Sequence, residues 1–193
     1  MIIKKQNQKG FTLIETLVSL FIFGMMSVAL VNIFVGALNS QTRILQNQDL
    51  MSQTSYVLER MGKIIRMAEK DVAGTCAPAG ESYLVSGQSI TFLTYDTKAA
   101  AYRCAKFSLE SNTIKESRST DTTAANLQAA QAITSSSIYV SGLSFTVTGD
   151  TLGESPALQP KTTILINARY NAVTANPPRL IIQTSISQRK LDI

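Results

Sequence analysis

The chain has 193 residues, of which 45% are hydrophobic and 16% are charged, and it contains two cysteines and no histidine. Without histidine the commonest general base is missing, so neither a Ser-His nor a Cys-His nucleophile pair can form. The sequence also lacks a glycine-rich phosphate loop and a metal-ligand cluster. We therefore expect a protein that is not an enzyme and that uses no metal or other cofactor.

The net charge of +5 is concentrated at the start of the chain. Three of the 18 basic residues are Lys4, Lys5 and Lys9. Without them, 15 basic residues face 13 acidic residues, which leaves a balance of +2. The sequence pI of about 9.3 therefore reports mainly the N-terminal segment, and nucleic acid is a minor candidate among the partners.

An apolar run follows this basic segment. Residues 16–42 are 27 consecutive uncharged positions, and Glu15 stands directly before them. About 20 apolar residues cross a bilayer as a helix, so the run is long enough to span. It is longer than the apolar region of an ordinary secretory signal peptide. The lysines before it predict a cytoplasmic N-terminus and an extracytoplasmic remainder.

The residues Gly10-Phe11-Thr12-Leu13-Ile14-Glu15 resemble the prepilin signature of the type IV pilin superfamily, which includes the pseudopilins of type II secretion. The resemblance implies that a prepilin peptidase cuts between Gly10 and Phe11 and then methylates the new N-terminal amine of Phe11. It also implies that Glu15 pairs with the N-terminal amine of a neighbouring subunit during assembly. A carboxylate in hydrocarbon needs such a partner; the alternative is an interfacial Glu15 that snorkels to water.

One position departs from the major pilins. Many of them carry a proline where this chain has Asn32, and the first proline of the chain is Pro78. No turn signal interrupts residues 12–70, so we predict one helix that ends at Gly74. Its later part carries apolar residues at helical spacing, namely Ile44, Met51, Leu58 and Ile65, reinforced by Leu45, Leu50, Met61 and Ala68. This stripe suits either packing against a sheet, which we favour, or a coiled coil.

The remaining sequence alternates short β-branched and aromatic runs with Ser, Gly, Asn and Asp, which is typical of an antiparallel sheet. The expected strands are Tyr83–Val85, Ser89–Tyr95, Tyr102–Leu109, Thr113–Glu116, Ile138–Thr148, Lys161–Tyr170 and Arg179–Ser187. Tight turns are expected at Ser86-Gly87-Gln88 and Ser111-Asn112, and longer loops at Asp150–Pro160 and Thr174–Pro178. Between Ser117 and Ser137 the composition predicts a loop, in which Leu127, Ala130 and Ile133 allow a short helix.

Cys76 and Cys104 both follow the span. In an oxidising compartment such a pair is most simply a disulfide. They are not spaced as a C-x-x-C redox pair, and two thiols without histidine do not make a metal site.

The expected fold is therefore α+β and type IV pilin-like, with one long N-terminal helix packed against an antiparallel headpiece. The expected segments are a cleaved leader (1–10), a membrane and filament-core helix (11–38), an amphipathic helix (39–72) and a β-rich headpiece (73–193). Diffuse similarity to J-type minor pseudopilins and minor pilins lies in Val57–Met61, Val140–Phe145 and Arg179–Arg189.

These features predict a structural subunit, a minor pilin or pseudopilin, anchored in the inner membrane and then assembled into a pilus or pseudopilus. Its expected partners are the prepilin peptidase, other pilin or pseudopilin subunits and an inner-membrane assembly platform. The alternatives are a major pilin, a DNA-uptake subunit with a basic patch at Arg179, Arg189 and Lys190, and a stand-alone bitopic binding protein. The sequence does not distinguish pilus from secretion or DNA uptake.

Overall fold

The computed structural model describes residues 10–149, 159–171 and 176–189. Helix α1 (Leu13–Ile65) comes first and is followed by short strands and loops. The chain divides into two units, Met1–Leu45 and Gln46–Ile193, so α1 contributes its first part to one unit and its last part to the other. The apolar side chains of α1 in the first unit, from Leu13 to Leu38, are exposed almost without exception.

In the second unit α1 is amphipathic. Its buried side chains are Leu50, Thr54, Val57, Met61 and Ile65. Their spacing of three or four residues keeps them on one face of the helix. The polar Thr54 is tolerated there because its hydroxyl donates to the carbonyl of Leu50, 2.7 Å away.

The predicted stripe is therefore only partly right. Ile65, Met61 and Leu50 are buried as expected and Leu58 is half-buried, but Met51 is exposed. The packed face lies one position away from the predicted series, because Leu50 and Val57 are buried in place of Met51 and Leu58. Ile44 and Leu45, which belong to the first unit, are exposed.

The helix also ends earlier than predicted, at Ile65 rather than at Gly74. Met67 closes a tight turn by donating to the carbonyl of Ile64. The chain then pairs as β1 (Ala68–Glu69) with Thr94 and Leu93. Neither glycine nor proline marks this end, because tertiary strand pairing takes over the backbone hydrogen bonds.

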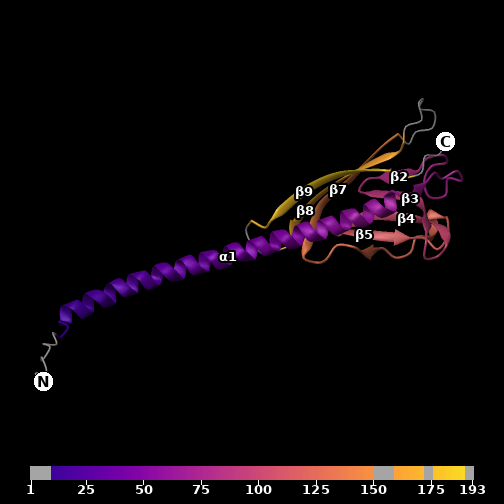
Figure 1. Cartoon of the computed structure of the whole chain (residues 1–193). Helices are drawn as coiled ribbons and strands as arrows, with labels where there is room; N and C mark the ends of the chain where they lie inside the picture. Colours follow the sequence, from indigo (N-terminus) through magenta and orange to yellow (C-terminus); the bar gives the residue numbers. More distant parts are fainter. Residues whose placement is uncertain (1–9, 150–158, 172–175, 190–193) are drawn as a thin grey trace, which may run out of the picture. The chain divides into compact units, whose positions relative to one another are not determined.

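Two antiparallel sheets complete the second unit (Figure 1). The first contains β1, β2 (Tyr83–Ser86), β3 (Ser89–Asp96), β4 (Ala101–Glu110), β5 (Thr113–Arg118) and β6 (Gln131–Ala132). Its order is β1-β3-β4-β5-β6, with β2 also paired to β3. The second has the order β7-β8-β9, from β7 (Ile138–Thr148), β8 (Lys161–Tyr170) and β9 (Arg179–Ser187).

All seven predicted strands are confirmed within two residues at each end. The two-residue strands β1 and β6 were not predicted. Between Ser117 and Ser137, where a loop was predicted, the chain is largely irregular, with a 3-10 turn at Ala124–Asn126 and then β6; the short helix allowed by Leu127, Ala130 and Ile133 does not form. Of the two expected loops, most of Asp150–Pro160 lies outside the described residues, as do Thr174 and Ala175, while residues 176–178 are described and lie outside any strand.

One core joins α1 to both sheets. Its largest fully buried side chains include Met61 from α1, Phe92 and Phe107 from the first sheet, and Ile164 and Ile166 from the second. Asn112, at the predicted turn between β4 and β5, has a φ of +61°. Its side-chain amide donates to the carbonyl of Val140, and its own carbonyl accepts from the Val140 N–H. This turn therefore links the first sheet to β7, where a β-bulge lies between Val140 and Gly142.

A network of charged side chains connects α1 to the first sheet. The carboxylate of Glu116 is buried and accepts from Arg60 of α1 at 2.6 Å and from Arg118 at 2.7 Å. Arg118 also donates to the buried Asp96, at 3.1 Å. Both buried acids of this network, Glu116 and Asp96, therefore have at least one guanidinium partner, which offsets the cost of placing a charge in a low-dielectric interior.

We predict that Glu116→Ala lowers the free energy of unfolding by about 2 kcal/mol, because Arg60 loses its ion-pair partner and Arg118 keeps only Asp96. The matched control is Glu110→Ala on the neighbouring strand, where the exposed carboxylate pairs with Lys115 at 3.1 Å. It should change the unfolding midpoint little, because exposed pairs are screened by solvent. Urea unfolding of the full chain in detergent, followed by circular dichroism, compares the two. Equal losses would contradict the buried role of Glu116.

Candidate functional site

The segment with the prepilin-like signature lies at the start of α1. Gly10 and Phe11 precede the helix and are exposed. The N–H groups of Glu15 and Thr16 both donate to the carbonyl of Thr12, at 3.1 and 3.2 Å, so Thr12 is the residue from which the helix starts. No heavy atom lies within 4 Å of the place where a Cβ on Gly10 would be. The Gly10–Phe11 peptide bond is therefore accessible and outside the helix.

The carboxylate of Glu15 lies in the first turn of α1. Its Oε2 atom is 3.5 Å from the backbone nitrogen of Thr12, a long hydrogen bond. A Glu three residues after a Thr is the signature of a capping box, in which the acid binds a free N–H at the helix start. Our sequence analysis did not use this Thr-x-x-Glu signal. The helix dipole favours a negative charge at the same place.

Hydroxyl groups in the apolar segment bond to carbonyls of the same helix. Ser19 donates to the carbonyl of Glu15 at 2.6 Å, and Ser27 donates to that of Phe23 at 2.8 Å. Such internal bonds make hydroxyl groups tolerable in hydrocarbon. The helix continues without interruption through Asn32.

By length and composition, α1 is the one helix in the described part of the chain that can cross a membrane, and its apolar window contributes nothing to the buried core. The basic segment and Glu15 precede this window.

Comparison with known proteins agrees with this assignment. The model of the prokaryotic N-terminal methylation motif matches residues 5–31. The match supports a type IV pilin-like prepilin, and with the long apolar helix it indicates membrane anchoring. Such a motif implies processing by a prepilin peptidase, assembly with other pilin subunits and a structural role. Searches of curated proteins and of solved structures found no match.

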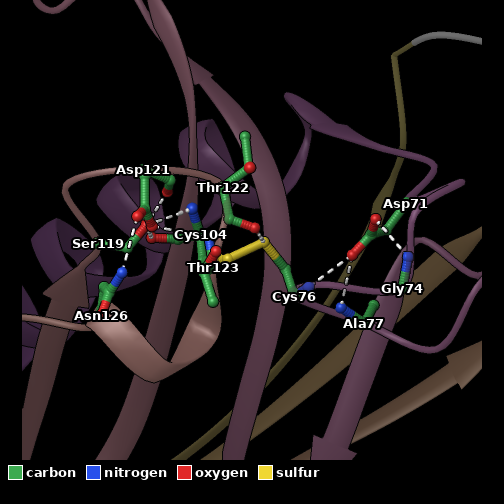
Figure 2. Close-up of a disulfide and its surroundings, with 10 residues drawn as sticks. All are labelled: Asp71, Gly74, Cys76, Ala77, Cys104, Ser119, Asp121, Thr122, Thr123 and Asn126. Atoms are coloured by element: carbon green, nitrogen blue, oxygen red, sulfur yellow. Dashed lines mark hydrogen bonds between the residues drawn. A yellow bond between two sulfur atoms is a disulfide. The ribbon is translucent and has the colours of Figure 1, made fainter.

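Cys76 and Cys104 are joined in a disulfide with a Cα–Cα distance of 5.5 Å (Figure 2). This is the pairing that the sequence analysis expected. It ties the loop after β1 to β4, and both sulfurs belong to buried residues. Within the described ranges, no group of three or more His, Cys, Asp or Glu residues is arranged to hold a metal ion.

Two acidic residues organise the loops on either side of the disulfide (Figure 2). Asp71 is buried and accepts hydrogen bonds from the N–H groups of Cys76, Ala77 and Gly74, at 2.6, 3.0 and 2.9 Å. On the other side the exposed Asp121 accepts from Thr123 and Asn126. Both acids therefore hold the backbone of these loops in place, which is a structural role.

The surroundings of Asp71 shift its pKa. Burial acts to raise the pKa of this carboxyl, but hydrogen bonds from backbone N–H groups outweigh burial and hold it below its usual range; the donors are Cys76, Ala77, Gly74 and Thr75. A group whose folded-state pKa is depressed stabilises the fold at pH above its unfolded pKa. That contribution is lost as the pH falls through the folded pKa.

We predict that Asp71→Asn lowers the free energy of unfolding by about 2 kcal/mol near neutral pH, because charge-assisted hydrogen bonds become weaker neutral ones. The deficit should shrink below about pH 4, where the wild-type carboxyl is protonated on unfolding. Urea unfolding at a series of pH values measures it, and Asp121→Asn serves as the exposed control with a smaller shift of the midpoint. A deficit independent of pH would contradict this account.

Proposed function

We propose that the chain is a minor pilin or pseudopilin: a membrane-anchored structural subunit that joins a type IV pilus or a type II secretion-like filament. The observation that carries the proposal is the position of Glu15. It is a single carboxylate in the first turn of a helix whose next 27 positions are uncharged. It coincides with the start of α1 and lies within the matched methylation motif.

In this proposal the peptidase cleaves between Gly10 and Phe11, and Phe11 becomes the methylated N-terminus. The accessible peptide outside the helix supports this site, since glycine lets an enzyme approach the backbone closely. Residues 1–10 are then a cytoplasmic leader, residues 11–38 the membrane and filament core, residues 39–72 the link into the headpiece, and residues 73–193 the extracytoplasmic headpiece.

Glu15 then has two successive partners. Before assembly, its carboxylate interacts among the described residues with the Thr12 N–H, through a long hydrogen bond, and with the helix dipole. In the filament the amine of Phe11 on a neighbouring subunit supplies a full positive charge, which stabilises both groups in a low-dielectric core. Burial of the exposed apolar helix faces against other subunits and the assembly platform accompanies this exchange.

The assignment to a minor subunit rests on two features. α1 continues through Asn32, where many major pilins have a proline. The disulfide closes early, at β4, and β7–β9 follow it without a cysteine. A major pilin remains the alternative, and the abundance of the chain in isolated filaments decides between them.

A DNA-uptake role receives less support. Arg179 is the first residue of β9 and Arg189 follows its last residue, Ser187, by two positions, so roughly 30 Å of chain separates them. Lys190 lies outside the described residues. The two described arginines therefore do not form the single basic patch that the sequence suggested.

We predict that Glu15→Gln lowers recovery of the chain in sheared filaments at least tenfold, while cleavage of the leader persists. Loss of one member of a buried ion pair costs about 3–5 kcal/mol. The matched control is Glu59→Gln, an exposed acid further along the same helix, which should assemble normally. Quantitative immunoblots of filament and membrane fractions measure both. Normal assembly of Glu15→Gln would contradict the proposed role, and an uncleaved chain would favour a stand-alone bitopic protein.

A further inference from the structure

Two arginines face each other at one end of the second sheet. Arg169 of β8 is the direct cross-strand partner of Arg179 of β9, and on its other side it is paired with Tyr139 of β7. The three side chains therefore form one row across the outer face of the sheet, which we call the 139–169–179 row. The guanidinium of Arg169 lies over the Tyr139 ring, 4.2 Å from its centroid. Arg179 is exposed.

Within the described residues, neither arginine of this row has a carboxylate partner. Like charges directly opposite each other destabilise a sheet. Among residues 10–149, 159–171 and 176–189, no carboxylate lies within 4 Å of either guanidinium. The arginines of the first sheet differ, since both Arg103 and Arg118 face Asp96. Two unpaired arginines in one row therefore fit an external anion.

The positive charge of the outer face lies at one end, because most of the remaining face is uncharged. From the row to Lys161, at the far end of β8, the exposed positions on this face are uncharged. They include Ser141, Ser144, Leu165, Asn167, Ile181 and Gln183. The face is thus basic at the 139–169–179 row and neutral across its middle.

The row lies at the end of the second unit where the chain enters from the apolar helix. Ser137, directly before β7, donates to the carboxylate of Asp49 at 3.1 Å, and Asn171, directly after β8, donates to the carbonyl of Ser137 at 2.7 Å. Among the described residues, two acids lie near this end, and both have partners: Asp49 accepts from Ser137 and Gln53, and Glu110, beside the turn at Asn112, pairs with Lys115. Asp49 comes only 11 residues after Leu38, the last residue of the proposed span.

We propose that the 139–169–179 row binds anionic phospholipid headgroups of the membrane in which the chain is anchored. Arginine is suited to phosphate because its planar guanidinium donates two parallel hydrogen bonds. Tyrosine is enriched at the headgroup level of membranes. The covalent anchor supplies a high effective concentration of the lipid surface, so two arginines suffice where a free protein would need more. Nucleic acid fits less well, because its binding uses many phosphate contacts and open aromatic faces, and here Arg169 covers the ring of Tyr139.

This binding holds one end of the β-rich unit against the bilayer before assembly. The inference rests on membrane anchoring and not on the role of Glu15 in a filament, so either can fail without the other.

Because the chain contains no tryptophan, a single introduced tryptophan reports its own surroundings. Ser141→Trp places the reporter beside the row, and Thr148→Trp places it at the far end of the same strand; both replaced residues are exposed. The full chain carrying one reporter is reconstituted in phosphatidylcholine vesicles with or without phosphatidylglycerol. A nitroxide-labelled headgroup lipid quenches any tryptophan that reaches the bilayer surface.

We expect the Ser141→Trp reporter to be quenched more strongly when phosphatidylglycerol is present, and the Thr148→Trp reporter to respond equally in both lipids.

Arg169→Gln with Arg179→Gln should reduce the ratio of docked to undocked protein about 25-fold, since each basic residue near an anionic surface contributes about fivefold. Lys161→Gln with Lys106→Gln removes the same charge elsewhere and should leave quenching unchanged. In the chain that keeps both arginines, added salt should abolish the extra quenching caused by phosphatidylglycerol. This arm tests the role of charge without substituting a charged residue.

Equal quenching in the two lipids, or quenching insensitive to salt and to the arginines, would overturn the proposal. A duplex oligonucleotide that binds through Arg169 and Arg179 while the lipid response is absent would also overturn it, in favour of nucleic acid.

Discussion

The structure depends on a single helix that meets two different environments along its length. From Leu13 to Leu38 most side chains of α1 are apolar on every side of the helix and are exposed, which suits a helix covered by lipid or by other helices. From Leu50 to Ile65 the helix buries one face in the core of a folded unit. The hydroxyl groups of Ser19 and Ser27 in the first part bond to carbonyls of the same helix, and its one acid lies at the helix start. This division matches the motif that relates the N-terminal segment to type IV pilin-like prepilins.

The second unit is fixed by contacts that tie distant segments to α1 and to each other. Arg60 reaches Glu116 across 56 residues of chain, and the turn at Asn112 joins the first sheet to β7. Gln188, which is buried, donates to the carbonyl of Ala68 at 2.7 Å and accepts from Ser82 at 3.3 Å, so the end of β9 is held beside the end of the helix. The disulfide and Asp71 stabilise the loop that follows β1. The result is one core, in which α1 is a structural part of the β-rich unit.

The sequence predicted the features that depend on local pattern. The span, the seven longer strands and the turn at Ser111-Asn112 follow from hydropathy, alternation and turn chemistry. It did not predict β1, β6 or the end of α1 at Ile65, because these depend on pairing with β3 and β5 rather than on glycine or proline. The Glu116 network and the 139–169–179 row require the strand register, which no short-range pattern encodes. The Thr12-x-x-Glu15 capping signal was present in the sequence and was overlooked.

The central claim is that Gly10–Glu15 is a working prepilin site at the start of α1. It is tested most directly by the intact mass and N-terminal peptide of the chain from membranes, with and without a co-expressed prepilin peptidase. The account predicts peptidase-dependent loss of residues 1–10 and one added methyl group on Phe11. A chain that begins at Met1 under both conditions would contradict it.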